Sequence, residues 1–248
     1  MSTVRKILII GATSAMARAI AATFARRGDS VYLAARDTDE VSRIAADLAV
    51  RYQVSSFHGE FDITKTSSHA SFVDQVAKAL GGLDGIVLAA GSMVDQMDAE
   101  KDFTLVETMV RVNYLGAMSV LNLCAQYLQD QKSGFIIGIS SVAGDRGRQS
   151  NYLYGSTKGA LTVYLSGLRN AMQAAGVHVM TVKPGFVDTA MTYGNKGMFL
   201  VASPQSIGDH VVAALEKKRN VVYLPWFWRY IMLIIRHIPE ALFKRLKL

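Results

Sequence analysis

The residues most able to do chemistry in this chain lie near its middle. Tyr154 and Lys158 are four residues apart in the run Tyr-Gly-Ser-Thr-Lys, so a helix would place them one turn apart on one face. A phenol has a pKa of about 10, and a nearby ammonium group stabilises the phenolate and lowers that pKa. The pair could therefore exchange a proton with a substrate near neutral pH. Because this spacing also arises by chance, two unrelated helix-surface residues are the alternative.

Two further polar residues accompany this pair. Ser141 precedes Tyr154 by 13 residues and follows the mostly apolar run 135–140, which predicts a strand. Ligands of open α/β sheets bind at the C-terminal ends of the strands, so Ser141 is expected at a binding site. Asn113 lies in the long helical pattern that precedes this strand.

Strand and helix patterns alternate along residues 4–224. The expected strands are residues 4–10, 30–34, 53–57, 85–89, 135–140, 177–183 and 221–224. The expected helices are residues 15–27, 39–50, 68–80, 103–130, 153–175 and 204–218. The alternation predicts an α/β fold, a doubly wound, Rossmann-type parallel sheet of about seven strands with helices on both faces. We expect a single domain over residues 1–224, followed by an amphipathic C-terminal helical tail over residues 225–248.

The first expected strand runs into a loop of small residues, Gly-Ala-Thr-Ser-Ala-Met-Ala, which opens the first helix. In a doubly wound sheet the pyrophosphate of a dinucleotide binds here, on the exposed N–H groups of the helix N-terminus. Two alanines stand where the glycine-rich pattern has further glycines, so the motif is weak and an ordinary tight turn is an equal alternative. The expected contacts to the cofactor are Gly11, Thr13, Ser14, Ala15 and Met16.

The residue after the second strand bears on the choice of cofactor. An acidic residue there would bind the ribose 2′-hydroxyl, but the sequence has Arg36, whose guanidinium can pair with a 2′-phosphate. We therefore expect NADP(H), with NADPH preferred over NADH; a solvated arginine is the alternative. Asp62 and Ile63 follow the third strand and are expected to contact the adenine, although Asp62 could equally cap a helix or a turn.

These residues, in this order, resemble the short-chain dehydrogenases/reductases over about residues 4–224. The residues that match the catalytic tetrad of that family are Asn113, Ser141, Tyr154 and Lys158. The resemblance implies that Tyr154 is the general acid/base and that Ser141 polarises the substrate carbonyl. It also implies that Lys158 holds the nicotinamide ribose and tunes Tyr154, and that Asn113 positions a water molecule. The implied reaction is hydride transfer between the nicotinamide and a carbonyl carbon.

Two other segments match the nicotinamide side of that family. Residues 184–189 match its Pro-Gly segment, which seats the nicotinamide, with the expected contacts Pro184, Gly185, Val187 and Thr189. Residues 88–91 are Leu-Ala-Ala-Gly where the family has Asn-Asn-Ala-Gly, so two asparagine contacts are missing while Ala90 and Gly91 remain. We expect Tyr154 and Lys158 to touch the cofactor as well. The five histidines lack the spacing of metal ligands, so no metal site is expected.

The charge of the chain is unevenly distributed. Lys and Arg number 27 and Asp and Glu 20, a net charge of +7, yet residues 216–248 hold eight basic and two acidic side chains. This concentration in an apolar tail argues against nucleic acid as a partner. A single cysteine excludes a disulfide scaffold, and 50% hydrophobic residues exclude disorder. The first apolar run is too short for a signal peptide, so we expect a cytoplasmic protein.

The tail combines aromatic and aliphatic residues with charged ones. The charged side chains are spaced as one helical stripe, bent at Pro239, that comprises Arg229, Arg236, Glu240, Lys244 and Lys247. The uncharged run between the two arginines is six residues long, whereas a membrane-spanning helix needs about 20 residues. The pattern is typical of a helix that lies in a membrane interface, so we expect peripheral contact with the inner face of the membrane. Packing on the body or on another subunit is the alternative.

The tail also makes the chain similar to one subgroup of the family, the decaprenylphosphoryl-2-keto-ribose (erythro-pentofuranosid-2-ulose) 2-reductases, which reduce a lipid-linked keto-sugar. This resemblance implies an NADP(H)-dependent oxidoreductase that acts on a carbonyl or secondary alcohol of such a lipid. Reduction of a soluble ketone, with the tail used for oligomerisation, is one alternative. A catalytically idle dinucleotide-binding sensor or scaffold is another. We expect a homodimer or a homotetramer.

Overall fold

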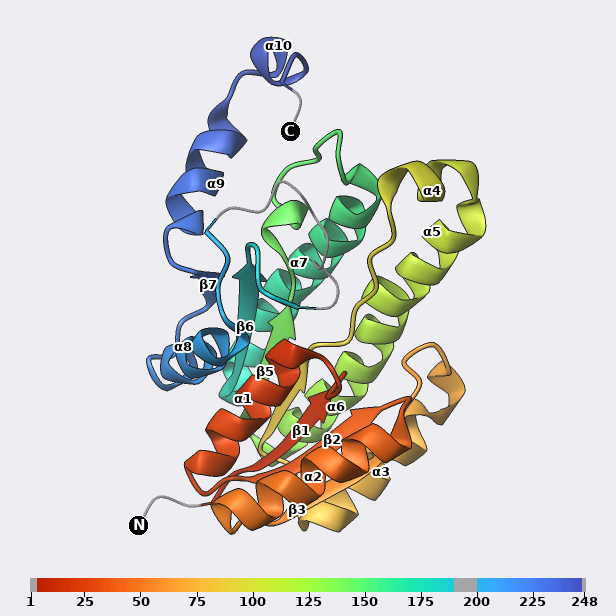
Figure 1. Ribbon diagram of the computed structural model, residues 1–248. Helices are drawn as coiled ribbons and strands as arrows, with labels where there is room; N and C mark the ends of the chain where they lie inside the picture. The colour runs from red at the N-terminus through yellow and green to blue at the C-terminus, as the bar shows by residue number, and fades with distance from the viewer. Residues whose placement is uncertain (1–3, 190–199, 247–248) are drawn as a thin grey trace.

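Seven parallel strands form one sheet in the computed structural model, which describes residues 4–189 and 200–246 (Figure 1). The order across the sheet is β3-β2-β1-β4-β5-β6-β7, and every neighbouring pair is parallel. The strands are β1 Lys6–Ile10, β2 Ser30–Ala35, β3 Ser56–Glu60, β4 Gly85–Leu88, β5 Gly134–Ile139, β6 Val177–Pro184 and β7 Val221–Leu224. The doubly wound, Rossmann-type fold expected from the sequence is confirmed.

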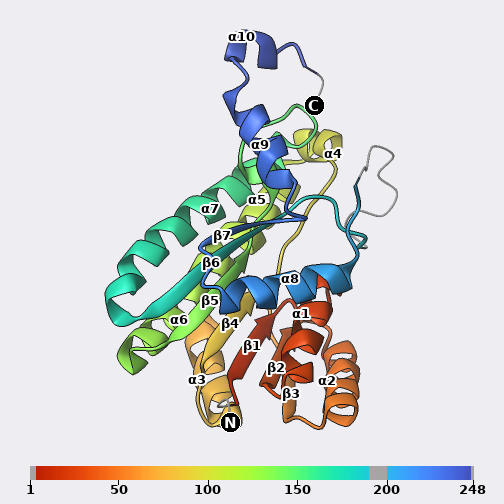
Figure 2. The same ribbon diagram turned by 90° about the vertical axis from the view of Figure 1, so that its left-hand side faces the viewer.

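Helices cover both faces of this sheet, as Figure 2 shows. They are α1 Ala15–Arg26, α2 Thr38–Tyr52, α3 His69–Leu80, α4 Gln96–Lys101, α5 Phe103–Val110, α6 Ala117–Gln131, α7 Tyr152–Met172, α8 Pro204–Glu216, α9 Trp228–His237 and α10 Glu240–Phe243. Ile7 and Ile9 of β1 point into the core under α1, α2 and α8, whereas Leu8 and Ile10 point into the core under α3, α6 and α7. Because successive side chains of a strand alternate between faces, an entirely apolar strand must be covered on both.

Two elements differ from the sequence-based expectation. Helix α2 continues to Tyr52, and Gln53 ends it in the left-handed conformation with φ of 56°, so β3 begins three residues later than the predicted 53–57. The predicted helix 103–130 is interrupted by a π-helical turn, Arg111–Gly116, between α5 and α6. Helix α4 was not predicted; the Asp95 side chain caps its N-terminus by accepting hydrogen bonds from backbone N–H groups.

The C-terminal tail forms two helices that are separated at Ile238 and Pro239 (Figure 1). The bend expected at Pro239 is confirmed, because a proline lacks the N–H that would continue α9. The inner face of α9 packs on the body, where Trp228 is 2% exposed and Met232 is 0% exposed. Its outer face leaves Leu233 54% and Ile234 67% exposed. Over the residues that the structure describes, no helix is long and apolar enough to cross a membrane.

Candidate active site

Several of the predicted site residues lie at one edge of the sheet, because each of these follows or ends a parallel strand at its C-terminal end. Gly11 follows β1, Arg36 follows β2, and Ala90 and Gly91 lie just beyond β4. Ser141 lies two residues after β5, and Pro184 ends β6. The edge toward which these strands point is therefore where a ligand of this fold would bind.

Ser141 is held in a short turn that packs on helix α7. Its side chain caps the 3₁₀ turn Val142–Gly144, since its Oγ accepts a hydrogen bond of 3.1 Å from the Ala143 N–H. Gly144 lies directly on α7, where an added Cβ would come 2.6 Å from the carbonyl carbon of Lys158. The turn and helix α7 thus approach each other closely enough to bring Ser141 beside the side chains of that helix.

Tyr154 and Lys158 lie on the buried face of α7, as their spacing predicted. Tyr154 is 9% exposed and Lys158 4%. The Lys158 Nζ lies 5.9 Å from the centroid of the Tyr154 ring and donates a 3.2 Å hydrogen bond to the carbonyl oxygen of Ile139. The lysine side chain therefore lies on the side of the tyrosine that faces strand β5, and its ammonium group is shielded from water.

Burial dominates the proton affinities of this pair. Desolvation raises the pKa of Tyr154 to about 12, although a hydrogen bond with Ser141 acts in the opposite direction. Desolvation lowers the pKa of Lys158 to about 8. The sequence-based expectation was a tyrosine pKa lowered by the lysine. In this structure the loss of water outweighs any effect of the ammonium, whose nitrogen lies 5.9 Å from the centroid of the tyrosine ring. Tyr154 is consequently a protonated phenol at neutral pH, which is the form that donates a proton.

Asn113 occupies the π-helical turn between α5 and α6 and is 1% exposed. Its Oδ1 accepts a 2.7 Å hydrogen bond from the Ser92 N–H, and its Nδ2 donates to the Ser92 carbonyl at 2.7 Å and to the Thr157 hydroxyl at 3.0 Å. Its amide is therefore fixed between the segment after β4 and helix α7. Sequence reasoning missed Ser92 and Thr157. The position of Thr157, directly before Lys158, was the available signal for the second of them.

The loop after β1 has the conformation that a phosphate contact needs. Gly11 has φ of 81°, and an added Cβ would lie 2.5 Å from the Ala90 backbone nitrogen, so neither the conformation nor the space admits another residue. Ser14 caps α1 by accepting a hydrogen bond from the Ala17 N–H. The first backbone N–H groups of a helix have no hydrogen-bond partner within the helix. The N–H groups of Ala15 and Met16 are among these groups, at the end of α1 that faces this loop.

Three other predicted contacts have distinct surroundings. The Arg36 side chain is exposed just after β2. The Asp62 carboxylate accepts hydrogen bonds from the N–H and the hydroxyl of Thr64, which is the turn role weighed as its alternative. Ile63 is 6% exposed in the core below the sheet edge. Contacts of Asp62 and Ile63 with an adenine stay predictions.

The segment after β6 meets the tail. The Gly185 N–H donates to the Leu224 carbonyl at 2.9 Å, and an added Cβ at Gly185 would overlap the indole of Trp228. Phe186 contacts the same indole edge-on, with ring centroids 5.5 Å apart. Val187 pairs with Ala202 in an isolated parallel bridge, and Thr189 is the last described residue before 190–199. No cluster of three metal-ligating side chains occurs within residues 4–189 and 200–246.

A doubly wound sheet with a buried tyrosine–lysine pair, a serine and an asparagine at its C-terminal edge defines an oxidoreductase. More particularly, the family model of the short chain dehydrogenases matches residues 5–197, and the chain belongs to that family. An uncharacterised oxidoreductase of Mycobacterium tuberculosis strain H37Rv is 31% identical over 97% of this chain and 96% of the relative. One of Streptomyces coelicolor is 32% identical over 98% of this chain and 96% of the relative.

Solved structures have the same fold. A short-chain dehydrogenase from Sphingobium yanoikuyae in complex with NADPH superposes with a TM-score of 0.82 at 22% identity, covering 96% of this chain and 98% of that one. A bulky-bulky ketone specific alcohol dehydrogenase from Comamonas testosteroni superposes with a TM-score of 0.80 at 20% identity, covering 96% and 97%. These two likenesses reach from the sheet into the C-terminal part of the chain.

The buried charge of Lys158 predicts a gain in stability from its removal. Lys158→Met should raise the free energy of unfolding at pH 7 by roughly 1–3 kcal/mol, because it removes an ammonium that folding must desolvate. The folded-state pKa of Lys158, about 8, lies below its ordinary value of 10.5, so the unfolded chain binds the proton more tightly. The contribution of Lys158 to stability is therefore complete above its pKa in the unfolded state. That contribution is lost as the pH falls through its pKa in the folded state.

The advantage of Lys158→Met should therefore shrink between pH 8 and pH 10.5, the two ends of the titration window. Denaturant unfolding at a series of pH values measures it. Lys78→Met, at an exposed position of α3, is the control and should show no such pH dependence. A Lys158 variant that is less stable than the parent at pH 7 would contradict this account.

Proposed function

We propose that the protein is an NADPH-dependent reductase that interconverts a carbonyl and a secondary alcohol. The observation that carries the proposal is that the buried Tyr154 lies close to the half-buried Ser141, with Lys158 one helical turn further along α7. Two hydroxyl groups that converge at the C-terminal edge of a sheet can bind the oxygen of a carbonyl substrate, and one of them can supply its proton.

The residues at the loop after β1 fit a dinucleotide. Gly11 leaves the backbone free to approach a pyrophosphate, and the N-terminus of α1 lies directly behind it. Gly91 leaves the approach to Lys158 clear, since an added Cβ would lie 3.2 Å from the lysine Nζ. When bound, the nicotinamide supplies the hydride. The ribose side of the site would be held by Lys158, and the nicotinamide side by Pro184 and Gly185.

The chain supplies the proton and the geometry. Tyr154, protonated at neutral pH, donates its Oη proton to the substrate oxygen as negative charge develops there. Ser141 donates a hydrogen bond to the same oxygen and orients it. The Lys158 ammonium stabilises the phenolate that remains, over a short distance in a site with little water. Asn113, fixed by Ser92 and Thr157, holds the helix turn that faces this lysine.

Preference for NADPH is proposed from Arg36. The sequence has no carboxylate at this first position beyond β2, and an exposed guanidinium can form a charge-assisted pair with a 2′-phosphate. The dehydrogenase from Sphingobium yanoikuyae, similar in fold, is described as a complex with NADPH. Its identity of 22% makes it support for the fold first and for the cofactor only by analogy.

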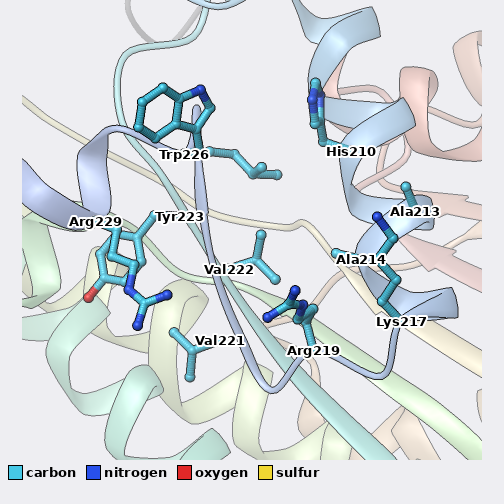
Figure 3. Close-up of a pocket in the computed structure, with 11 residues that line it drawn as sticks. His210, Ala213, Ala214, Lys217, Arg219, Val221, Val222, Tyr223, Trp226 and Arg229 are labelled. Carbon is cyan, nitrogen blue, oxygen red and sulfur yellow. The ribbon is translucent and has the colours of Figure 1, made fainter.

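For the substrate we propose a carbonyl on a lipid, with a lipid-linked keto-sugar as the first candidate, reached by peripheral contact of residues 225–248 with an anionic membrane. The outer face of α9 supports this, because Tyr230, Leu233 and Ile234 are all more than half exposed. A pocket of about 370 Å³ at the base of the tail adds cations: Figure 3 shows Arg219 and Arg229 on either side of β7, below Trp226. A soluble ketone, with this surface covered by a second subunit, is the competing proposal.

The proposed proton donor can be tested by removing one hydroxyl. Tyr154→Phe should lower kcat by about 10²–10⁴-fold, because the transition state loses its general acid. NADPH oxidation is followed with lipid-linked keto-sugars and with a reactive diketone, 9,10-phenanthrenequinone. Tyr152→Phe, two residues earlier on the exposed start of α7, is the matched control and should keep full turnover. Unchanged turnover in Tyr154→Phe would overturn the proposed proton donor, whereas NADPH binding without turnover in the parent protein would leave only a dinucleotide-binding sensor.

Cofactor choice is tested at Arg36. Arg36→Ala should raise the KM for NADPH by about 10–100-fold, the value of a lost charge-assisted hydrogen bond, and leave the KM for NADH within about twofold. Arg43→Ala, on the exposed face of α2, serves as the control. A parent protein that prefers NADH contradicts the assignment outright.

Membrane contact is tested on the outer face of α9 alone, since its inner face is part of the core. Leu233→Ser combined with Ile234→Ser should weaken binding to phosphatidylglycerol vesicles at least about tenfold, because two apolar side chains no longer leave water. The melting temperature should stay unchanged. Val50→Ser combined with Val163→Ser, at exposed positions of α2 and α7, is the matched control. Equal binding of both pairs, or a change in oligomeric state only, would favour the soluble-ketone proposal.

A further inference from the structure

The turn that carries Ser141 is enclosed between two parts of the molecule. On one side it lies against α7, where Gly144 meets Lys158 and the Ala143 carbonyl approaches Gly155. On the other side Val142 belongs to a buried cluster with Trp228 and Met232 of α9. The C-terminal helix is thus the second wall of the catalytic turn.

Asp145, the residue that follows this turn, links the turn to the sheet. The Asp145 carboxylate forms a buried ion pair with Lys183 of β6, and the side chains of the two are 2% and 7% exposed. Its second oxygen accepts a 2.7 Å hydrogen bond from the Tyr223 hydroxyl of β7. Lys183 and Tyr223 lie on the last two strands of the sheet, β6 and β7, so the Asp145 carboxylate fixes one end of the turn to the sheet edge.

Arg146 joins the same turn to the end of the tail. One guanidinium nitrogen donates to the carbonyl oxygens of Ile235 and Ile238 at 2.6 and 2.7 Å, and the other pairs with Glu240 at 2.8 Å. The guanidinium carbon lies 3.6 Å from the centroid of the Phe243 ring. The side chain is only 15% exposed. A single arginine therefore binds the last carbonyls of α9 and the start of α10 together.

We propose that Arg146 is a positioning residue for the reaction: by binding the tail it holds the turn that orients the Ser141 hydroxyl. Arg146 lies five positions after Ser141, and the backbone between them is one 3₁₀ turn with hydrogen bonds from Gly144 to Ser141 and from Asp145 to Val142. Without Arg146 to bind the tail, this turn loses its packing against Trp228 and becomes more mobile. The hydroxyl must then be ordered again in each turnover, which lowers kcat. This inference rests on the proposed role of Ser141.

The contacts of Arg146 need two donor nitrogens of one planar guanidinium, so Arg146→Lys is an informative substitution. A lysine keeps the charge, but its single ammonium cannot reproduce the fork that spans two carbonyls and a carboxylate. Glu240 is 77% exposed on its side chain, and an exposed ion pair contributes little. Glu240→Gln should therefore leave the turn in place, which separates the carbonyl contacts of Arg146 from its ion pair.

Hydrogen exchange measures the turn without any substrate. In Arg146→Ala, peptides that cover residues 141–146 should exchange their amide protons at least about tenfold faster than in the parent, since local opening becomes easier. Arg146→Lys should be intermediate, and Glu240→Gln should match the parent. Arg51→Ala, which breaks a surface pair with Asp47 on α2, is the control. Unchanged exchange in Arg146→Ala overturns the proposal.

Turnover then separates positioning from simple stabilisation. With NADPH and 9,10-phenanthrenequinone, Arg146→Ala should lower kcat about tenfold and leave NADPH affinity, measured by fluorescence titration of the folded protein, within about twofold. In a Ser141→Ala background the same substitution should cost less than about twofold, because the hydroxyl it positions is absent. An equal loss in both backgrounds overturns the proposal. Full turnover in Ser141→Ala alone would overturn the proposed role of Ser141 and with it this proposal, whereas absence of turnover in the parent protein would overturn the proposed function and leave the exchange result standing. If Arg146→Ala does not fold, Arg146→Lys carries the same comparison.

Discussion

Close backbone approach at the C-terminal edge of the sheet is the constraint on which this structure depends. Four side chains can act on one small ligand only if the segments that carry them nearly touch, and the chain places glycine at those contacts. Gly11 faces the backbone of Ala90, Gly144 faces Lys158, and Gly185 faces the Trp228 indole. A Cβ at any of the three would separate two segments of the site. The alanines that replace other glycines of the phosphate loop are tolerated because Ala15 and Ala17 lie in α1 itself, where the backbone is an ordinary helix.

The same closeness explains the proton affinities. Packing that brings Tyr154 and Lys158 against the sheet also removes water from both, and desolvation outweighs their mutual effect. A tyrosine that stays protonated suits reduction, in which the phenol is the donor. Burial of a charged lysine costs free energy of folding. The protein nevertheless retains Lys158 at a position where an apolar residue would make the fold more stable.

The sequence allowed much of this to be predicted, for physical reasons that differ between elements. Short apolar runs that alternate with helical patterns predicted the sheet, and the order of Ser141, Tyr154 and Lys158 predicted their meeting at its edge. The start of β3 was misplaced because the left-handed Gln53 leaves no compositional signal. The π-helical turn at Asn113 was missed because it lies inside a continuous helical pattern and has no sequence signature of its own. Arg146 and Trp228 could not be found at all, since their partners lie far away along the chain.

The tail was weighed as either a membrane contact or a packing element, and α9 has one face that packs on the body and one that is exposed. Its inner residues complete the wall behind Ser141, so the last part of the chain supports a turn whose Arg146 lies 92 residues before its partner Ile238. Protein synthesis runs from the N-terminus, and a nascent chain emerges in that order. The sheet and its helices can therefore assemble during translation, whereas the catalytic turn gains its second wall only after the final helices leave the ribosome.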